Sequence, residues 1–122
     1  MSAIDTVNAK FLLYCPLSAA EQSAAEDLCA ESYARIQARL HSPEDDAEDD
    51  RVLQCAALEA AYDWVCRKCL EQLKRPAFRA GDITVASPDY LRAFDMIYRL
   101  WHIALDDAAP LLKDPAFYAE SV

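Results

Sequence analysis

The stretch VLQCAALEAAYDWVCRKCLEQL, residues 52–73, decides the fold of this chain. Its apolar residues recur at helical spacing, but they cover more than one stripe of the helix surface. A helix that is apolar over so much of its circumference is usually central and packed on several sides. We therefore predict one long central helix from Asp49 to Lys74, ended by Pro76 because the residue before a proline is disfavoured in helical conformation.

Two further helices are predicted before the central one. A short first helix spans Thr6–Cys15, and Pro16 ends it. Ser18 and Glu21 have the spacing of a capping box, in which each side chain satisfies a free backbone N–H at a helix start. This second helix continues on one apolar stripe and ends near Leu40–His41.

The segment after the central helix differs in kind, and we predict an extended arm or a short hairpin over residues 76–86. Ile83–Val85 favours extended backbone, and Gly81-Asp82 favours a turn. Ser87 and Pro88 then have the residue types of an N-cap and a first helical position.

The last long helix is predicted to start at Ser87 and to be kinked or ended by Pro110. A C-terminal tail follows at about residues 111–122. The chain of 122 residues has the length of one domain, and it contains a single glycine, whereas β-rich folds need several for turns and bulges. The fold class is therefore all-α: one small bundle of three long helices plus a short N-terminal helix.

The charge balance limits the classes of partner. A net charge of −9 argues against nucleic acid and anionic membrane surfaces, both of which attract Lys and Arg. The N-terminus lacks the layout of a secretion signal, so we expect a cytoplasmic protein. The acidic run Glu44–Asp50 is interpreted as a solvated loop, because it lacks the glycine and the alternation of a calcium-binding loop.

Candidate chemistry is sparse. Cys66 and Cys69 form a CxxC pair, whose spacing occurs in zinc and redox sites, yet it lies near a helix end where core packing is the plainer interpretation. Neither His41 nor His102 accompanies a recognisable nucleophile. We predict no catalytic residue, no metal site and no cofactor, and hence no enzyme.

The arm is the least domain-like part of the chain. Phe78, Ile83 and Val85 suit an exposed linker poorly. They fold back on helices of the same chain or they reach a neighbouring copy, and the residues leave both options open. The predicted subunit interface comprises Phe78, Arg79, Asp82, Ile83, Thr84, Val85, Phe117 and Tyr118.

Two short stretches and the helix order carry a family resemblance. The chain has FLLYCP at residues 11–16, helices at 25–40 and 52–73, FRAGDITV at 78–85 and a helix ending APLLKDPAF at 109–117. This layout resembles the head–tail connector (neck, head-completion) proteins of tailed bacteriophages and prophages, over nearly the whole chain.

The resemblance implies an all-α, non-enzymatic structural protein. Such proteins assemble as rings between the capsid portal and the tail, so the implied partners are further copies, portal proteins and tail proteins. The implied location is the bacterial host cytoplasm and then the virion neck. The alternative is a cytosolic helical regulatory or protein-binding module stabilised by zinc through Cys66 and Cys69.

Overall fold

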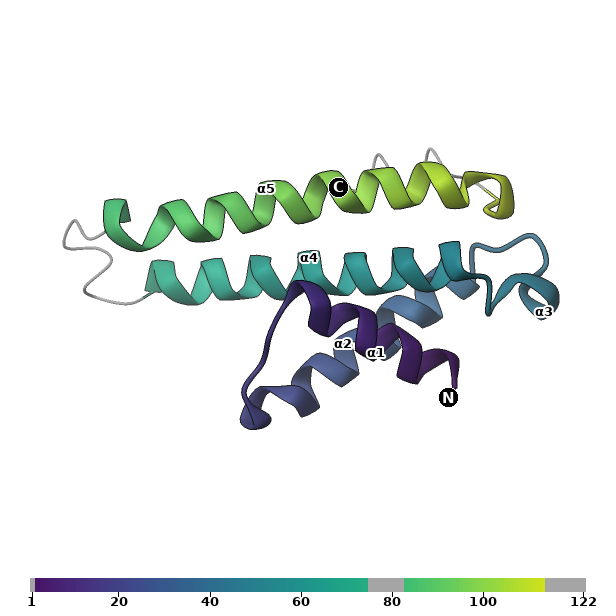
Figure 1. Ribbon diagram of the computed structural model, residues 1–122, viewed down its shortest axis with the longest axis horizontal. Coiled ribbons are helices and arrows are strands. Elements are labelled where there is room, and N and C mark those ends of the chain that lie inside the picture. The colour runs from purple at the N-terminus through teal and green to yellow at the C-terminus, as the bar shows by residue number, and fades with distance from the viewer. Residues whose placement is uncertain (1, 75–82, 114–122) are drawn as a thin grey trace.

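The computed structural model of the chain describes the backbone of residues 2–74 and 83–113, with side chains at 2–71 and 92–113. Within these ranges every regular element is helical. The elements are α1 (Ala3–Tyr14), α2 (Ala19–Gln37), α3 (Pro43–Asp46), α4 (Asp50–Lys74), α5 (Ile83–Ala108) and the 3₁₀ helix η2 (Ala109–Leu111). Figure 1 shows α4 and α5 side by side and antiparallel, with α1 and α2 on the other side of α4. The predicted all-α bundle is confirmed.

The central helix α4 was predicted to within one residue, and it packs against α1, α2 and α5. Its buried side chains are Val52, Leu53, Cys55, Ala56, Ala57, Leu58, Ala60, Ala61 and Val65. The four alanines have 0% exposure. Small side chains let neighbouring helices approach closely, so α4 can be covered from several sides without voids.

Capping boxes fix the starts of α1 and α2. The Ser18 backbone N–H donates to Glu21 Oε1 at 3.3 Å, as the sequence predicted. An equivalent box at Ser2 and Asp5, in which the Asp5 N–H donates to Ser2 Oγ at 3.3 Å, starts α1 at Ala3. The predicted start at Thr6 was therefore too late, because this earlier cap was not recognised.

The helix α2 ends at Gln37, before the predicted Leu40–His41, and the chain then pairs with the C-terminal segment. Leu40 and Leu112 form an isolated antiparallel bridge, and both side chains are buried. The Lys113 N–H donates to the Arg39 carbonyl oxygen at 2.7 Å. Residues 111–113 thus belong to the folded domain, and the remainder of the predicted tail lies outside the described residues.

The start of α5 differs from the prediction. The helix begins at Ile83, so the extended conformation predicted for residues 83–86 is wrong, and Ser87 is not its N-cap. The β-branched residues at 83–85 each cost a helix only a fraction of a kcal/mol, which a long packed helix overrides. Pro88, at the sixth helical position, removes one backbone hydrogen bond near the helix start.

The acidic run also contains more structure than the predicted loop. Pro43–Asp46 forms the single turn α3, in which Pro43, Glu44 and Asp45 are exposed and Asp46 is half-buried. The Tyr33 hydroxyl donates to the Ala47 carbonyl oxygen at 2.7 Å and so ties this segment to α2. The run remains a solvated surface, and its proline supplies the pre-set backbone angle that suits a helix start.

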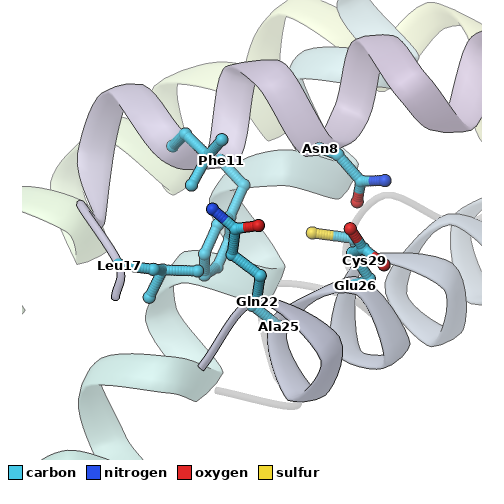
Figure 2. Close-up of a pocket in the computed structure, with 8 residues that line it drawn as sticks. Asn8, Phe11, Leu17, Gln22, Ala25, Glu26 and Cys29 are labelled. Carbon is cyan, nitrogen blue, oxygen red and sulfur yellow. The ribbon is translucent and has the colours of Figure 1, made fainter. Parts of the chain in front are cut away.

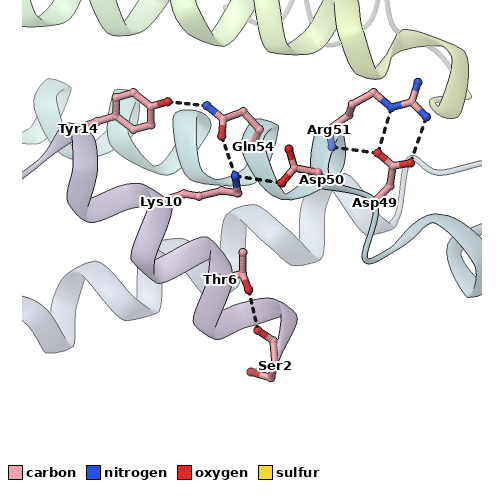
Figure 3. A network of polar contacts seen from close by, with 8 residues as sticks. All are labelled: Ser2, Thr6, Lys10, Tyr14, Asp49, Asp50, Arg51 and Gln54. Carbon is pink, nitrogen blue, oxygen red and sulfur yellow. Dashed lines mark hydrogen bonds and ion pairs between the residues drawn. The ribbon is translucent and has the colours of Figure 1, made fainter.

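Polar side chains hold α1 against the first half of α4 (Figure 3). Lys10 Nζ lies 3.1 Å from Asp50 Oδ1 and 3.3 Å from Gln54 Oε1. The Gln54 side-chain amide donates to the Tyr14 hydroxyl oxygen, so one residue of α4 links two turns of α1. Val7 and Phe11, also on α1, are buried in the core.

The close packing of α4 predicts that added volume there will be costly. Replacing Ala60, which is fully buried, by leucine should lower the free energy of unfolding by about 1–3 kcal/mol. The matched control is Ala20→Leu on the exposed side of α2, which should change it by less than about 0.5 kcal/mol. Urea unfolding followed by circular dichroism measures both. Equal effects from the two substitutions would contradict the close packing of α4.

Candidate functional site

All eight residues of the predicted interface lie where the structure describes no side chains. Phe78, Arg79, Asp82, Phe117 and Tyr118 are outside the described residues. Ile83, Thr84 and Val85 form the first turn of α5, where the backbone alone is described. The structure therefore brings none of these side chains together, and their role stays a prediction.

The part of α4 that leads to this segment projects from the bundle. Among the described side chains of α4, which end at Glu71, the last buried one is Val65, yet the helix continues to Lys74, a further distance of about 13 Å. Figure 1 shows the first turns of α5 beside this end of α4, beyond the region covered by α1 and α2. We call residues 66–74 and 83–91 the projecting hairpin, and we use the word tip for residues 75–82, which join its two helices in sequence and lie outside the described residues. Leu70 on the hairpin is 56% exposed.

The base of the projecting hairpin is fastened by Lys68. Its Nζ lies 2.8 Å from Glu21 Oε2 on α2 and 3.4 Å from Glu71 Oε2 on α4. It also lies 4.8 Å from the centre of the Trp64 ring, and Trp64 packs edge-on against Phe11 at 6.3 Å. One half-buried lysine thus joins the starts of α2 and of the hairpin.

The CxxC pair lies on the projecting hairpin, with both thiols half-buried and free. Burial raises the pKa of the Cys66 thiol, an effect that Tyr62 partly offsets by hydrogen bonding. Burial also raises the pKa of the Cys69 thiol. A redox cysteine needs a lowered thiol pKa, so both shifts oppose that chemistry. In the described part of the chain, no three His, Cys, Asp or Glu side chains are placed to share a metal ion.

The other three cysteines belong to the core. Burial raises the pKa of the Cys15 thiol to about 11. It raises the pKa of the Cys29 and Cys55 thiols to about 12. Neutral thiols are poor nucleophiles and behave as small apolar side chains.

An aromatic cluster joins α4 to α5. The ring of Tyr62 lies 5.0 Å from Phe94, 5.8 Å from Tyr98 and 5.2 Å from Trp101, between ring centres. These ring contacts join the two helices, and of the four residues Trp101 is buried. His102 stacks 4.4 Å from Tyr98. Among the described residues, the buried Trp101 Nε1 and His102 Nε2 have no hydrogen-bond partner.

The carboxylate of Glu59, whose side chain is 13% exposed, lies between α2 and α4. Arg35 Nε contacts Glu59 Oε1 at 2.8 Å, and Ser32 is fully buried beside them. Its hydroxyl donates to the Ala56 carbonyl oxygen at 2.7 Å. Burial raises the pKa of the Glu59 carboxyl, and this exceeds the lowering by Arg35. No local spacing predicts this ion pair, because Arg35 and Glu59 are far apart along the chain.

A small cavity of about 70 Å³ lies between α1 and α2 (Figure 2). Phe11, Leu12, Leu17 and Ala25 supply its apolar lining. Its polar lining consists of Asn8, Gln22, Glu26 and Cys29. Asn8 Oδ1 is buried without a partner among the described residues, and water molecules fit a polar site of this size. With the Cys29 thiol neutral, the cavity holds no activated nucleophile.

Exposed large apolar side chains mark two outer surfaces, neither of which the sequence predicted. Leu12 and Leu13 on α1 are 41% and 78% exposed. Met96 and Ile103 on α5 are 58% and 57% exposed. No helix in the described ranges combines the length and apolar character that a membrane span requires. Apolar groups gathered on a surface often mark contacts with other proteins.

Comparison with family models, with curated proteins and with solved structures finds no match to this chain. Function must therefore be inferred from the chain's own residues and geometry. The features described above are packed thiols, a structural ion pair, a small cavity, exposed apolar surfaces and the projecting hairpin. Of these features, the exposed apolar surfaces and the projecting hairpin are suited to binding another macromolecule.

The buried Glu59 predicts a specific pH dependence of stability. Because its folded-state pKa is raised, the folded chain holds this proton more tightly than the unfolded chain. The resulting stabilisation is present below the ordinary glutamate pKa and is lost as the pH rises through the folded pKa. The free energy of unfolding of the wild type, minus that of Glu59→Gln, should therefore decrease as pH rises through this window. Urea titrations at several pH values measure it.

Glu31→Gln, at an exposed position of α2, is the matched control for that titration. It should leave the difference nearly constant over the same pH range, since exposed charges contribute little to stability. A difference for Glu59→Gln that is flat or that increases with pH would contradict the raised carboxyl pKa.

Thiol accessibility gives a second prediction. Cys66 and Cys69 should react with an aromatic disulfide reagent well before the three buried thiols, because reaction needs an accessible thiolate. The Cys66→Ser/Cys69→Ser variant should lose the fast phase, and all thiols should react in denaturant. Absorbance of the released thiolate measures the rates. Rapid reaction of any of the three remaining buried thiols in that double variant would show that the core opens readily, and it would contradict the prediction.

Proposed function

We propose that this chain is a non-enzymatic structural subunit that adapts a bacteriophage or prophage capsid portal to the tail by assembling into a ring. The first support is the resemblance of FLLYCP at 11–16, FRAGDITV at 78–85 and APLLKDPAF at 109–117, within this helix order, to head–tail connector proteins. The second support is that the chain folds as the all-α bundle this resemblance implies.

The observation that carries the proposal is the projecting hairpin. Ring closure requires two different surfaces, one of which reaches the next subunit. Helix α4 runs about 13 Å past Val65, the last of its described side chains that is buried, and Figure 1 shows this end of α4 beyond the region covered by α1 and α2. A rigid pair of helices positions such a contact more accurately than a free linker, because less conformational entropy is lost on binding.

The alternative of a zinc-stabilised regulatory module has no comparable support. A structural zinc site takes four ligands, and the described residues bring no third ligand to Cys66 and Cys69. We therefore do not propose it as a second function.

Electron microscopy of this protein mixed with its portal protein tests the proposal. We expect a ring of copies of this chain on the tail-facing side of the portal. Phe78→Ser, at the tip, should reduce ring occupancy without changing the unfolding temperature, because the contact forms only between subunits. Ala20→Ser, on the exposed side of α2, is the matched control and should assemble as the wild type does.

Two results would contradict this prediction. Absence of the chain from the portal, with the other neck proteins present, would remove the proposed function. A lowered unfolding temperature for Phe78→Ser would assign the tip to its own subunit, so that the ring contact would lie elsewhere.

A further inference from the structure

The outer side of α5 carries an ordered line of side chains. Met96 and Ile103 are seven residues apart and therefore lie on one side of the helix, two turns from each other. Both are more than half exposed. We call the line the outer stripe; it comprises Arg92, Met96, Arg99, Leu100, Ile103 and Asp107.

Met96 and Ile103 of the outer stripe are exposed, whereas Leu100 packs against the edge of the core and Asp107 acts electrostatically on Arg51 and Cys55 of α4. The buried side of α5 is formed by Ile97, Trp101, Ala104, Leu105 and Ala108. These residues pack towards α4, and Figure 1 shows α5 as the outermost of the described helices on that side. No described element of the same chain covers Met96 and Ile103, in keeping with their exposure.

We propose that a second copy of this chain binds the outer stripe, with the two α5 helices antiparallel about a two-fold axis between Arg99 and Leu100. In that arrangement, positions equally far from the axis face each other. Met96 then faces Ile103 of the other copy, and the reciprocal contact repeats it. The apolar side chains that one copy exposes are thus covered by those of the next.

The charges of the stripe match the same alignment. Arg92 and Asp107 are also equally far from the axis, on opposite ends, so each arginine meets an aspartate of the other copy. Asp106 adds negative charge beside Asp107. A parallel pair would instead bring Arg92 to Arg92 and Asp107 to Asp107, with like charges in contact. The antiparallel order is the one that this charge pattern favours.

The remaining arginine of the stripe does not oppose the pair. Arg99 lies next to the two-fold axis, where the two copies bring their arginines near each other. Its Nη2 lies 3.2 Å from Asp95 Oδ2 in the same helix, which neutralises its charge locally. Among the described residues, neither Arg92 nor Asp106 forms an ion pair. Asp107 acts electrostatically on Arg51 of the same copy.

The length of the outer stripe limits the surface area that the two copies can bury between them. From Arg92 to Asp107 the helix is about 24 Å long, so two facing helices bury no more than the low end of specific interfaces, roughly 1,200 Å². We expect a dissociation constant on the order of micromolar. The pair is a property of the purified chain and needs no phage component, so its failure and the failure of the proposed function are separate results.

Sedimentation equilibrium of the purified full chain over a wide concentration range is the test. We expect a monomer–dimer equilibrium that Ile103→Glu abolishes. Leu13→Glu is the matched control, because Leu13 is the more exposed leucine of α1, on the opposite side of the molecule. It should leave the equilibrium unchanged.

Charge reversal tests the alignment itself. Arg92→Asp alone and Asp107→Arg alone should each be monomeric at concentrations where the wild type pairs, since each brings like charges together. An equimolar mixture of these two variants should pair again, because position 92 of each then faces an opposite charge at position 107 of the other. Circular dichroism checks that both variants remain folded.

Several outcomes would overturn the proposal. A wild type that stays monomeric while Ile103→Glu lowers its unfolding temperature would assign the stripe to an occupant within the same chain. A monomer unaffected by Ile103→Glu would leave the stripe to a different protein. Failure of the mixed variants to pair would reject the antiparallel alignment, and pairing by every variant would place the contact elsewhere.

Discussion

The close packing of α4 on three sides is the constraint on which the rest of the structure depends. Ala56, Ala57, Ala60 and Ala61 leave no exposed surface, and their small side chains let α1, α2 and α5 lie against one helix at once. This packing also decides where polar groups can go. The Ser32 hydroxyl reaches the Ala56 carbonyl oxygen at 2.7 Å because no larger side chain separates α2 from α4. A single core can therefore be built from four helices in a chain of 122 residues.

The sequence predicted the parts of the fold whose signals are local or periodic. The apolar pattern of α4 and the proline after it predicted a helix from Asp49 to Lys74, and the observed helix is Asp50–Lys74. The Ser18–Glu21 box was visible as a spacing of residue types. The start of α5 was not predictable in this way, because the β propensity of Ile83–Val85 is a weak local preference and helix packing is a tertiary effect. The bridge between Leu40 and Leu112 joins distant residues and leaves no periodic signal.

The candidate surfaces show a similar division. Tyr62 and Trp101 pack against each other between α4 and α5, and the CxxC cysteines are half-buried, so the expected lack of zinc or redox chemistry at the CxxC pair stays a prediction. The exposure of Met96 and Ile103 was missed. Met96 and Ile103 are not among the buried residues of α5, but a sequence does not say whether another helix covers the side of α5 on which they lie. The Arg35–Glu59 pair was missed for the same reason, because it depends on how α2 crosses α4. Whether the predicted interface at 78–85 packs within its own subunit or against another is not decided by residue types.

The two proposed contacts use different parts of the chain, and this has a consequence for assembly. The outer stripe starts at Arg92, about 14 Å along α5 from Ile83, so a second copy bound there leaves the first turns of α5 uncovered. An antiparallel pair, however, directs its two projecting hairpins to opposite ends, whereas a cyclic ring places every hairpin at the same level. Copies that are paired through α5 must separate before they enter one ring. On these proposals the α5 contact belongs to the free protein, and its micromolar strength is what allows a portal with many binding positions to compete for the subunits.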